Sequence, residues 1–179
     1  MARSLNGIDI REFGSGNPGA TNVYRAAGRG AGLLTLALDV LKGMVPVLLV
    51  TRLFPEDQAL ASCAGLAAIA GHNWTPFLSF KGGKGVATSI GVFLALIPKP
   101  ALIAVGCFAV CLLLTRHVSL SSLVGSIGLV VSTAILARSE VFTGLTFICA
   151  VLTFVLHKKN ISRLIRGEEP KMLFGKSDG

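Results

Sequence analysis

Apolar residues occur along the whole chain in runs that are separated by short polar and glycine-rich junctions. Six runs stand out, at about residues 31–51, 58–71, 86–97, 101–115, a run that ends near 137, and 141–156. The first run reaches the length of about 20 residues that a helix needs to cross the hydrocarbon core of a bilayer. The pattern predicts an all-α polytopic membrane protein with about six transmembrane or partly re-entrant helices.

The second and third runs, 58–71 and 86–97, are short for a full span. Alanine and glycine in 58–71 favour close approach between helices. These two helices either continue into the neighbouring loop residues or enter the membrane as a re-entrant pair, and the pattern leaves both arrangements open. After the last run, the apolar spacing at Ile161, Leu164 and Ile165 predicts a short amphipathic helix on the membrane surface.

Composition agrees with a membrane protein. Of the 179 residues 52% are hydrophobic and 15% are charged, and the mean hydropathy is +0.70. Soluble domains carry about 25% charged residues. The net charge is +8, but the charges lie between apolar runs with one Trp and one Tyr, which favours anionic head-groups and phosphorylated substrates over nucleic acid. The four cysteines lie in apolar segments without a Cys-x-x-Cys pair, so neither a metal site nor a bound cofactor is predicted.

The basic residues predict the orientation of the chain in the membrane. Four polar junctions, residues 1–30, 81–84, 116 and 158–176, hold 13 of the 17 lysines and arginines. The positive-inside rule therefore assigns these junctions to the cytoplasmic face. The expected organisation is one domain with three parts, a cytoplasmic loop at 1–30, a helical bundle at 31–156 and a cytoplasmic tail at 157–179.

The junction between the second and third runs contains Lys81-Gly82-Gly83-Lys84-Gly85, which we call the lysine loop. Its glycines permit backbone conformations that other residues avoid, so that successive N–H groups can converge on an anion, and its two lysines add positive charge. This combination indicates phosphate binding at the membrane edge. The alternative is a cationic turn that anchors two helices among lipid head-groups.

A second glycine-rich stretch, Gly14-Ser15-Gly16-Asn17-Pro18-Gly19-Ala20-Thr21-Asn22, precedes the first long run. Its letters match the dinucleotide fingerprint G-x-G-x-x-G, but no buried strand precedes it and a membrane helix follows it. Ala20 also stands where a P-loop requires lysine. What remains is a loop that, with Ser15 and Arg25, can bind an oxyanion, or else a plain interfacial loop.

The first long run carries Asp39 and Lys42, which are three residues apart and so share a helical face. Charges inside a membrane are costly, and we favour a structural ion pair over a catalytic one. Together with the short second and third helices, this pair also allows a different class of protein, a transporter or channel for phosphorylated solutes. A non-catalytic membrane scaffold is the third possibility.

Three stretches carry a family resemblance: residues 14–22, residues 71–74 with 81–88, and residues 157–164. They resemble, in order, the three motifs of the bacterial acyl-phosphate:glycerol-3-phosphate acyltransferase family, PlsY, and the resemblance covers essentially the whole chain. It implies a multi-pass enzyme of the cell inner membrane with its active site facing the cytoplasm. The implied reaction transfers an acyl group from acyl phosphate to the 1-hydroxyl of glycerol 3-phosphate, giving 1-acyl-sn-glycerol 3-phosphate and phosphate, the first committed step of phospholipid biosynthesis.

The resemblance also implies roles for particular residues and partners. The catalytic positions fall on Ser15, Arg25, His157 and Asn160. The positions that bind substrate phosphate fall on Ser15, Arg25, Lys84, Ser122, Gly82, Gly83 and Gly85. Beyond its two substrates and membrane lipid, the enzyme is expected to be coupled to a soluble or peripheral enzyme that makes acyl phosphate. Read from the residues alone, Ser122 can instead cap the helix that ends near residue 137, and His157 can be an interfacial anchor.

Two departures from the family pattern stand out. The family has seven helices, and the first usually carries a Ser-x-Pro-x-Gly stretch ahead of the segment that corresponds here to Asp9-Ile10-Arg11. We expect the coding sequence upstream of Met1 to specify such a helix. Lys159 also stands beside Asn160 where the family often has glutamate, which puts a structural pairing there in doubt.

Acyl phosphate is already activated, because phosphate is a good leaving group. The chain shows no convincing Ser-His-Asp or Cys-His arrangement near the membrane face, and a covalent acyl-enzyme is unnecessary. The predicted mechanism is direct attack by the glycerol 3-phosphate hydroxyl, with the proton passing to a substrate phosphate oxygen or to His157.

Overall fold

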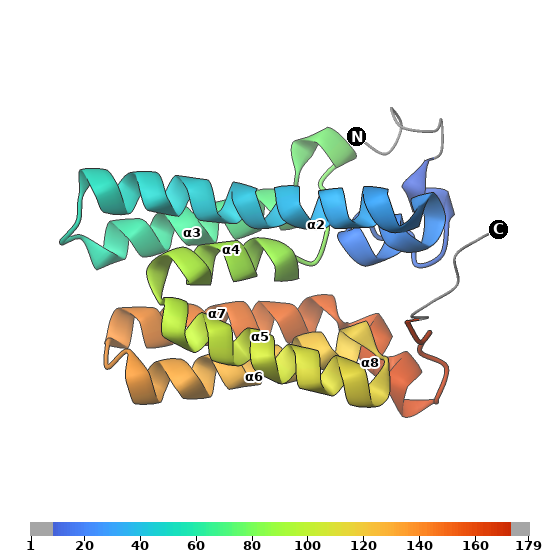
Figure 1. Cartoon of the computed structure of the whole chain (residues 1–179). Coiled ribbons are helices and arrows are strands. Elements are labelled where there is room, and N and C mark those ends of the chain that lie inside the picture. The colour runs from blue at the N-terminus through green and yellow to red at the C-terminus, as the bar shows by residue number, and fades with distance from the viewer. Residues whose placement is uncertain (1–8, 173–179) are drawn as a thin grey trace. The chain divides into compact units, whose positions relative to one another are not determined.

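The structure of the chain is a computed structural model that describes residues 9–172, and every regular element within that range is helical. The prediction of an all-helical chain is confirmed. The chain forms two compact units, one ending at Leu96 and the other beginning at Ile97 (Figure 1). Arg3 and Lys176, which contributed to the charge count, and the outer ends of the expected loop and tail lie outside the described residues.

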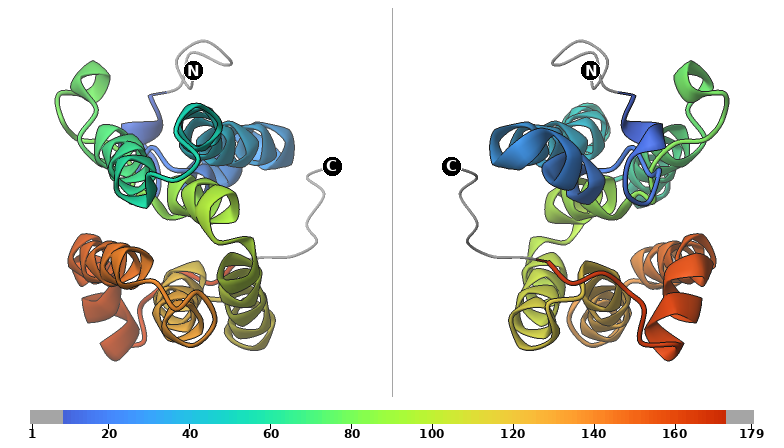
Figure 2. Two further views of the ribbon diagram at one scale, coloured as in Figure 1. Left: turned by 90° about the vertical axis from the view of Figure 1, so that its left-hand side faces the viewer. Right: turned by 90° about the vertical axis from the view of Figure 1, so that its right-hand side faces the viewer.

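From residue 9 onward, the first unit contains two 3-10 helices and three α-helices: η1 (Ile10–Glu12), α2 (Ala20–Leu53), α3 (Gln58–Asn73), η2 (Pro76–Leu78) and α4 (Val86–Leu96). Each of the three α-helices packs against the other two, as the end-on views of Figure 2 show. The expectation of a loop up to residue 30 is wrong, because α2 begins at Ala20. Alanines 26 and 27 favour helix although their polar neighbours break the apolar pattern, and the non-helical backbone of Gly28 (φ 84°) kinks α2 there.

Helices α2 and α4 approach closely because glycines lie between them. A Cβ atom on Gly43 of α2 would lie 2.1 Å from the carbonyl oxygen of Thr88. A Cβ atom on Gly91 of α4 would lie 2.0 Å from the carbonyl oxygen of Val40. Any larger residue would force the backbones apart, so small residues determine the helix spacing here, as they do in many membrane bundles.

The second unit, as far as residue 172, contains four helices: α5 (Pro98–Thr115), α6 (Val118–Leu136), α7 (Glu140–Leu156) and α8 (Lys158–Ile165). Helix α6 lies between α5 and α7 and packs against both (Figure 2). The chain bends by 61° between α7 and α8, with His157 at the junction. Helix α8 confirms the short tail helix that was predicted from the spacing of Ile161, Leu164 and Ile165.

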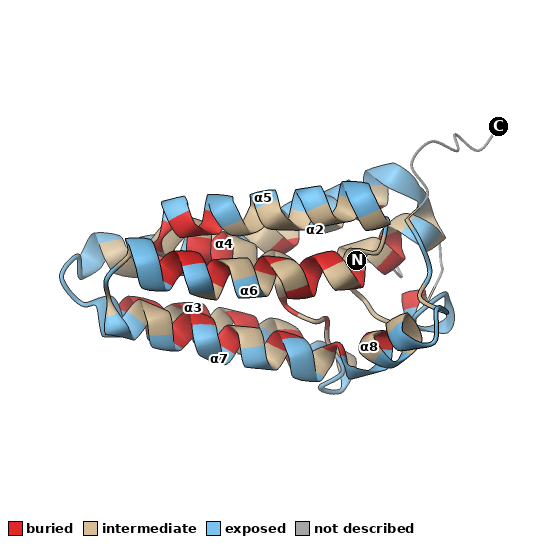
Figure 3. Cartoon of the chain, turned by 90° about the horizontal axis from the view of Figure 1, so that it is seen from below, coloured by how far each residue is buried: buried red, intermediate tan, exposed pale blue. Residues whose placement is uncertain are grey.

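Within the described residues, α2, α5 and α6 are long and apolar enough to cross a membrane, and α7 with α8 becomes a fourth span if the bent pair counts as one. Helices α3 and α4, with 16 and 11 residues, stay below that length, as their short apolar runs had indicated. Exposed positions occur along the length of α5, α6 and α7 (Figure 3). Many of them are large apolar residues, and Leu113 and Leu114 of α5 are 72% and 80% exposed. Such surfaces suit contact with lipid tails.

Candidate functional site

The lysine loop rests on the last turn of α3. The N–H groups of Gly82 and Gly83 donate to the carbonyl oxygens of Asn73 and His72, at 3.0 and 3.2 Å. These two N–H groups therefore do not point together toward an anion, contrary to the arrangement expected from the glycine pattern. The assignment of Gly82, Gly83 and Gly85 to phosphate binding stays a prediction.

The same glycines are needed for close packing. A Cβ atom on Gly83 would lie 2.0 Å from Nε2 of His72, and one on Gly85 would lie 2.5 Å from Oδ1 of Asn73. Gly85 also has a φ of +75°, which L-residues rarely adopt. Lys84 is held between these two fixed glycines and is half-buried, whereas Lys81 is exposed. The shape of the loop on either side of Lys84 is thus determined by the end of α3.

Asp39 of α2 lies at the centre of a small polar cluster. Its Oδ1 is 2.6 Å from Nζ of Lys42, which confirms the ion pair predicted from their spacing. The same oxygen is 3.6 Å from Nδ1 of His72. The side chains of Asp39 and His72 are 10% and 9% exposed, while Lys42 is half-exposed. The proximity of Asp39 to His72 was not predicted from the sequence. The two residues lie on different helices, α2 and α3, so no spacing along the chain indicates that they are close.

The amino-terminal glycine-rich loop is organised around the buried side chain of Asn22. Its Nδ2 donates to the carbonyl oxygens of Ile10 and Phe13, both at 3.0 Å, and its Oδ1 accepts from the N–H of Ser15 at 3.1 Å. The Ser15 hydroxyl in turn accepts from the N–H of Asn17 at 3.4 Å. The N–H of Ser15 is therefore hydrogen-bonded within the loop, and its exposed side chain is the part of the residue that can contact a ligand. Arg25, on the first turns of α2, is also exposed.

In the second unit, His157 is buried at the junction of α7 and α8. Its Nδ1 lies 2.7 Å from the carbonyl oxygen of Thr153, and the residue is 3% exposed. A carbonyl oxygen only accepts, so we infer that Nδ1 carries the hydrogen. In the neutral imidazole Nε2 is then the nitrogen that can accept a proton.

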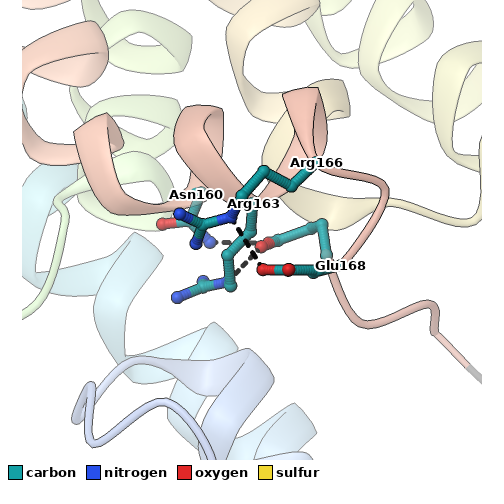
Figure 4. A network of polar contacts seen from close by, with 5 residues as sticks. Asn160, Arg163, Arg166 and Glu168 are labelled. Carbon is teal, nitrogen blue, oxygen red and sulfur yellow. Dashed lines mark hydrogen bonds and ion pairs between the residues drawn. The ribbon is translucent and has the colours of Figure 1, made fainter.

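Asn160 of α8 belongs to a charged network (Figure 4). Its Nδ2 donates to Oε1 of Glu169 at 2.6 Å, and Nε of Arg163 donates to Oε2 of the same carboxylate at 2.7 Å. Burial acts to raise the pKa of Glu169, but its side-chain hydrogen bonds, which include those from Asn160 and Arg163, together with the charge of Arg163 leave the pKa below its ordinary value. Asn160 thus has an acidic partner, although its neighbour Lys159 is not acidic. Sequence analysis missed Glu169.

Ser122 lies inside α6 and does not cap it, so that alternative is wrong. The residue at the N-cap position of α6 is His117, because the helix begins at Val118, ahead of the polar serines. The buried Ser122 hydroxyl donates to the carbonyl oxygen of Val118 at 2.8 Å. This bond to the preceding turn is the usual local partner of a serine in a helix.

The predicted site residues thus fall into two groups. Ser15, Arg25 and the lysine loop belong to the first unit, and Ser122, His157 and Asn160 belong to the second. In the second unit α8 contacts both α6 and α7, and His157 lies at the junction between α7 and α8. In the first unit each glycine-rich stretch is held by an asparagine, Asn22 or Asn73.

Comparison with known proteins gives one consistent result. The sequence model of a family described as glycerol-3-phosphate acyltransferase matches residues 1–167. A protein of that name from Geobacter sulfurreducens is 46% identical over 169 residues, which cover 94% of this chain and 86% of the relative. Another from Halalkalibacterium halodurans is 42% identical over 178 residues, which cover 96% and 86%.

Solved structures give the same result. The crystal structure of PlsY, an integral membrane glycerol 3-phosphate acyltransferase, in its glycerol 3-phosphate form has a TM-score of 0.91 and 37% identity, covering 94% of this chain and 84% of that one. The lysophosphatidic acid form of PlsY has a TM-score of 0.88 and 36% identity, covering 96% and 85%. These similarities extend over both units.

Proposed function

Because this multi-pass integral membrane chain belongs to the glycerol-3-phosphate acyltransferase family, we propose that it transfers an acyl group from acyl phosphate to the 1-hydroxyl of glycerol 3-phosphate. The products are 1-acyl-sn-glycerol 3-phosphate, a lysophosphatidic acid, and inorganic phosphate. The observation that carries the proposal is similarity along nearly the whole chain. The matched residues 1–167 include all three motif stretches, 14–22, 71–88 and 157–164.

Both substrates of this reaction carry phosphate groups, so the site must supply cations and hydrogen-bond donors. Arg25 and Lys84 supply the charge, and charge-assisted hydrogen bonds to phosphate are the strong ones. The Ser15 hydroxyl accepts from Asn17 and can donate its own hydrogen to a phosphate oxygen. Ser122 can do so only by giving up its bond to the carbonyl oxygen of Val118.

His157 and Asn160 are proposed to act on the acceptor hydroxyl. The hydroxyl oxygen attacks the acyl carbonyl carbon, the new ester C–O bond forms, and the bond from that carbon to the phosphate oxygen breaks. The hydroxyl proton passes to the departing phosphate or to Nε2 of His157, the nitrogen left without hydrogen when Nδ1 donates to Thr153. Asn160, whose Nδ2 is held by Glu169, can orient the acceptor.

Direct transfer needs no covalent intermediate, because the acyl group arrives on a good leaving group. The protein then contributes position and charge, which together can lower a barrier substantially. A burst of phosphate release together with a trapped acyl-protein would contradict direct transfer.

The basic junctions support a site at the cytoplasmic face of the inner membrane. Exposed cations such as Arg25, Lys81 and Lys158 lie at the ends of the helices rather than along them. A soluble or peripheral enzyme that makes acyl phosphate can deliver its product to this face, and the lysophosphatidic acid stays in the lipid. Labelling of a Lys81→Cys variant with a membrane-impermeant thiol reagent tests the orientation. A cytoplasmic position 81 should react in opened membranes but not in intact cells.

The decisive assay uses membranes that contain the chain and labelled glycerol 3-phosphate. Acyl phosphate, acyl-CoA and acyl-carrier protein are offered as separate donors, and the labelled lipid product is measured. The proposal expects product with acyl phosphate alone, and loss of that product in His157→Ala. Turnover with acyl-CoA but not acyl phosphate would contradict the proposed donor, and uptake of label into sealed vesicles without product would indicate a transporter.

A further inference from the structure

The end of α3 holds the lysine loop through both of its last residues. The carbonyl oxygens of His72 and Asn73 accept from Gly83 and Gly82 at 3.2 and 3.0 Å. The side chains of the same two residues also pack against the loop, because a Cβ atom on Gly83 would come within 2.0 Å of Nε2 of His72 and one on Gly85 within 2.5 Å of Oδ1 of Asn73. The imidazole therefore packs directly against Gly83, which is the residue before Lys84.

The imidazole is itself held from another helix. Nδ1 of His72 lies 3.6 Å from Oδ1 of Asp39, and both side chains are about nine-tenths buried. This separation is longer than a direct hydrogen bond, but the nearby negative charge favours the neutral form in which Nδ1, facing Asp39, carries the hydrogen. Lys42 lies one helical turn further along α2 and forms an ion pair with the same oxygen at 2.6 Å, which restrains the Asp39 side chain.

We infer that His72 is a positioning residue of the reaction, oriented by Asp39, and that it determines where the Lys84 ammonium meets substrate phosphate. The inference rests on the proposed phosphate-binding role of Lys84. A purely structural explanation requires only that α2 and α3 pack, and an apolar residue can do that. Here a buried carboxylate is retained inside a membrane helix and lies 3.6 Å from the imidazole that packs against Gly83.

The test measures KM for glycerol 3-phosphate and kcat in membranes, for the full chain and its variants. His72→Ala is expected to raise this KM about tenfold while kcat changes by less than about threefold, because displacement of a binding group by about 1 Å is costly. His72→Gln, whose amide fills the space beneath Gly83, is expected to restore KM to within about threefold of the unmodified chain. Asp39→Asn is expected to raise KM about threefold, and Cys63→Ala, exposed on the same helix, to leave it unchanged.

A double mutant separates positioning from general destabilisation. In a chain that already carries Lys84→Ala, His72→Ala should raise KM by less than about twofold, because its effect passes through the missing ammonium. KM does not depend on how much of a variant is correctly inserted, so partial loss of protein leaves the measurement valid. A lower kcat at unchanged KM in both His72 variants, or fully additive effects in the double mutant, would overturn the inference.

The parallel Lys84→Ala measurement distinguishes this inference from the proposed function. If Lys84→Ala raises KM and His72→Ala does not, only the positioning role is overturned. If Lys84→Ala leaves KM unchanged, the phosphate-binding role of Lys84 fails first, and the positioning role fails with it. If both single variants raise KM and their effects are not additive, the inference is supported.

Discussion

Glu169→Gln tests whether Asn160 is held in place by a charged partner. Glutamine keeps the shape of the side chain, which is 7% exposed, and removes its charge. The carboxylate accepts from Asn160 at 2.6 Å and from Arg163 at 2.7 Å, whereas an amide has one oxygen to offer and one NH₂ group that must face a donor. A charge-assisted bond contributes about 1.5–3 kcal/mol and a neutral one about 0.5–1.5 kcal/mol. We expect a loss of roughly 2 kcal/mol, about 30-fold in an equilibrium.

Two measurements detect this loss. The midpoint of thermal unfolding in detergent should fall by about 4–8 °C, the shift that roughly 2 kcal/mol produces in a chain of this size. The transfer rate at saturating substrate should fall about tenfold or more, because Asn160 is proposed to orient the acceptor and loses its fixed partner. Product formation from labelled glycerol 3-phosphate gives the rate.

The adjacent residue provides the matched control. Glu168 accepts from Nε of Arg166 at 2.8 Å, but both side chains are 58% exposed, and an exposed ion pair contributes about 0–1 kcal/mol (Figure 4). Glu168→Gln should therefore lower the midpoint by at most about 2–4 °C, and by less than Glu169→Gln. Equal behaviour of the two variants would refute the reasoning, because it would mean that the contacts of Glu169 contribute no more than a surface pair.

Further predictions follow from the same contacts. Lys84→Ala and Arg25→Ala should each lower kcat/KM for glycerol 3-phosphate about ten- to a hundredfold while the chain still inserts, and Lys81→Ala should change it less than about threefold; near-normal turnover in the first two variants would exclude their phosphate-binding role. Gly83→Ala should mainly raise KM for glycerol 3-phosphate, because a Cβ atom there meets an imidazole nitrogen at 2.0 Å, and an unchanged KM would identify the loop as a simple turn. Glu169 has a pKa below its ordinary value of 4.5, so the stability that its charge contributes is present above pH 4.5 and is lost as the pH falls through the lowered pKa. Unfolding midpoints between pH 6 and about pH 3 should therefore fall more steeply in the unmodified chain than in Glu169→Gln.

The sequence predicts helices well where an apolar run ends at a clear signal. The last run was expected at 141–156 and forms α7 (Glu140–Leu156), which begins after Ser139, whose hydroxyl accepts from the N–H of Phe142 at 3.4 Å. The start of α2 was missed because its first turns, residues 20–30, carry polar side chains. Periodicity detects helices that bury or expose an apolar face, and these turns do neither clearly.

The candidate site was predictable in its residues but not in their partners. Asp39 and Lys42 are one helical turn apart, so their pairing follows from sequence alone. The contact between Asp39 and His72 depends on how α2 packs against α3, and sequence spacing contains no record of that packing. Glu169 reaches Asn160 because the chain turns back after α8 at Gly167, whose φ is +70°. The glycine marks a helix end, but it does not indicate which side chain the returning segment will meet.

The two contacts that the sequence did not predict, Asp39 with His72 and Glu169 with Asn160, each place a carboxylate beside a residue near the end of a helix, and this shared feature has a physical reason. A carboxylate beside a membrane is costly to bury, so it persists only where its contacts outweigh the loss of hydration. At Glu169 the hydrogen bonds outweigh burial, since the pKa is lowered despite it. At Asp39 the half-exposed Lys42 supplies the compensating charge. An apolar residue could fill either space, but it could not orient an amide or an imidazole. The amide of Asn160 and the imidazole of His72 both need a defined orientation if they are to position groups that act on a phosphorylated substrate.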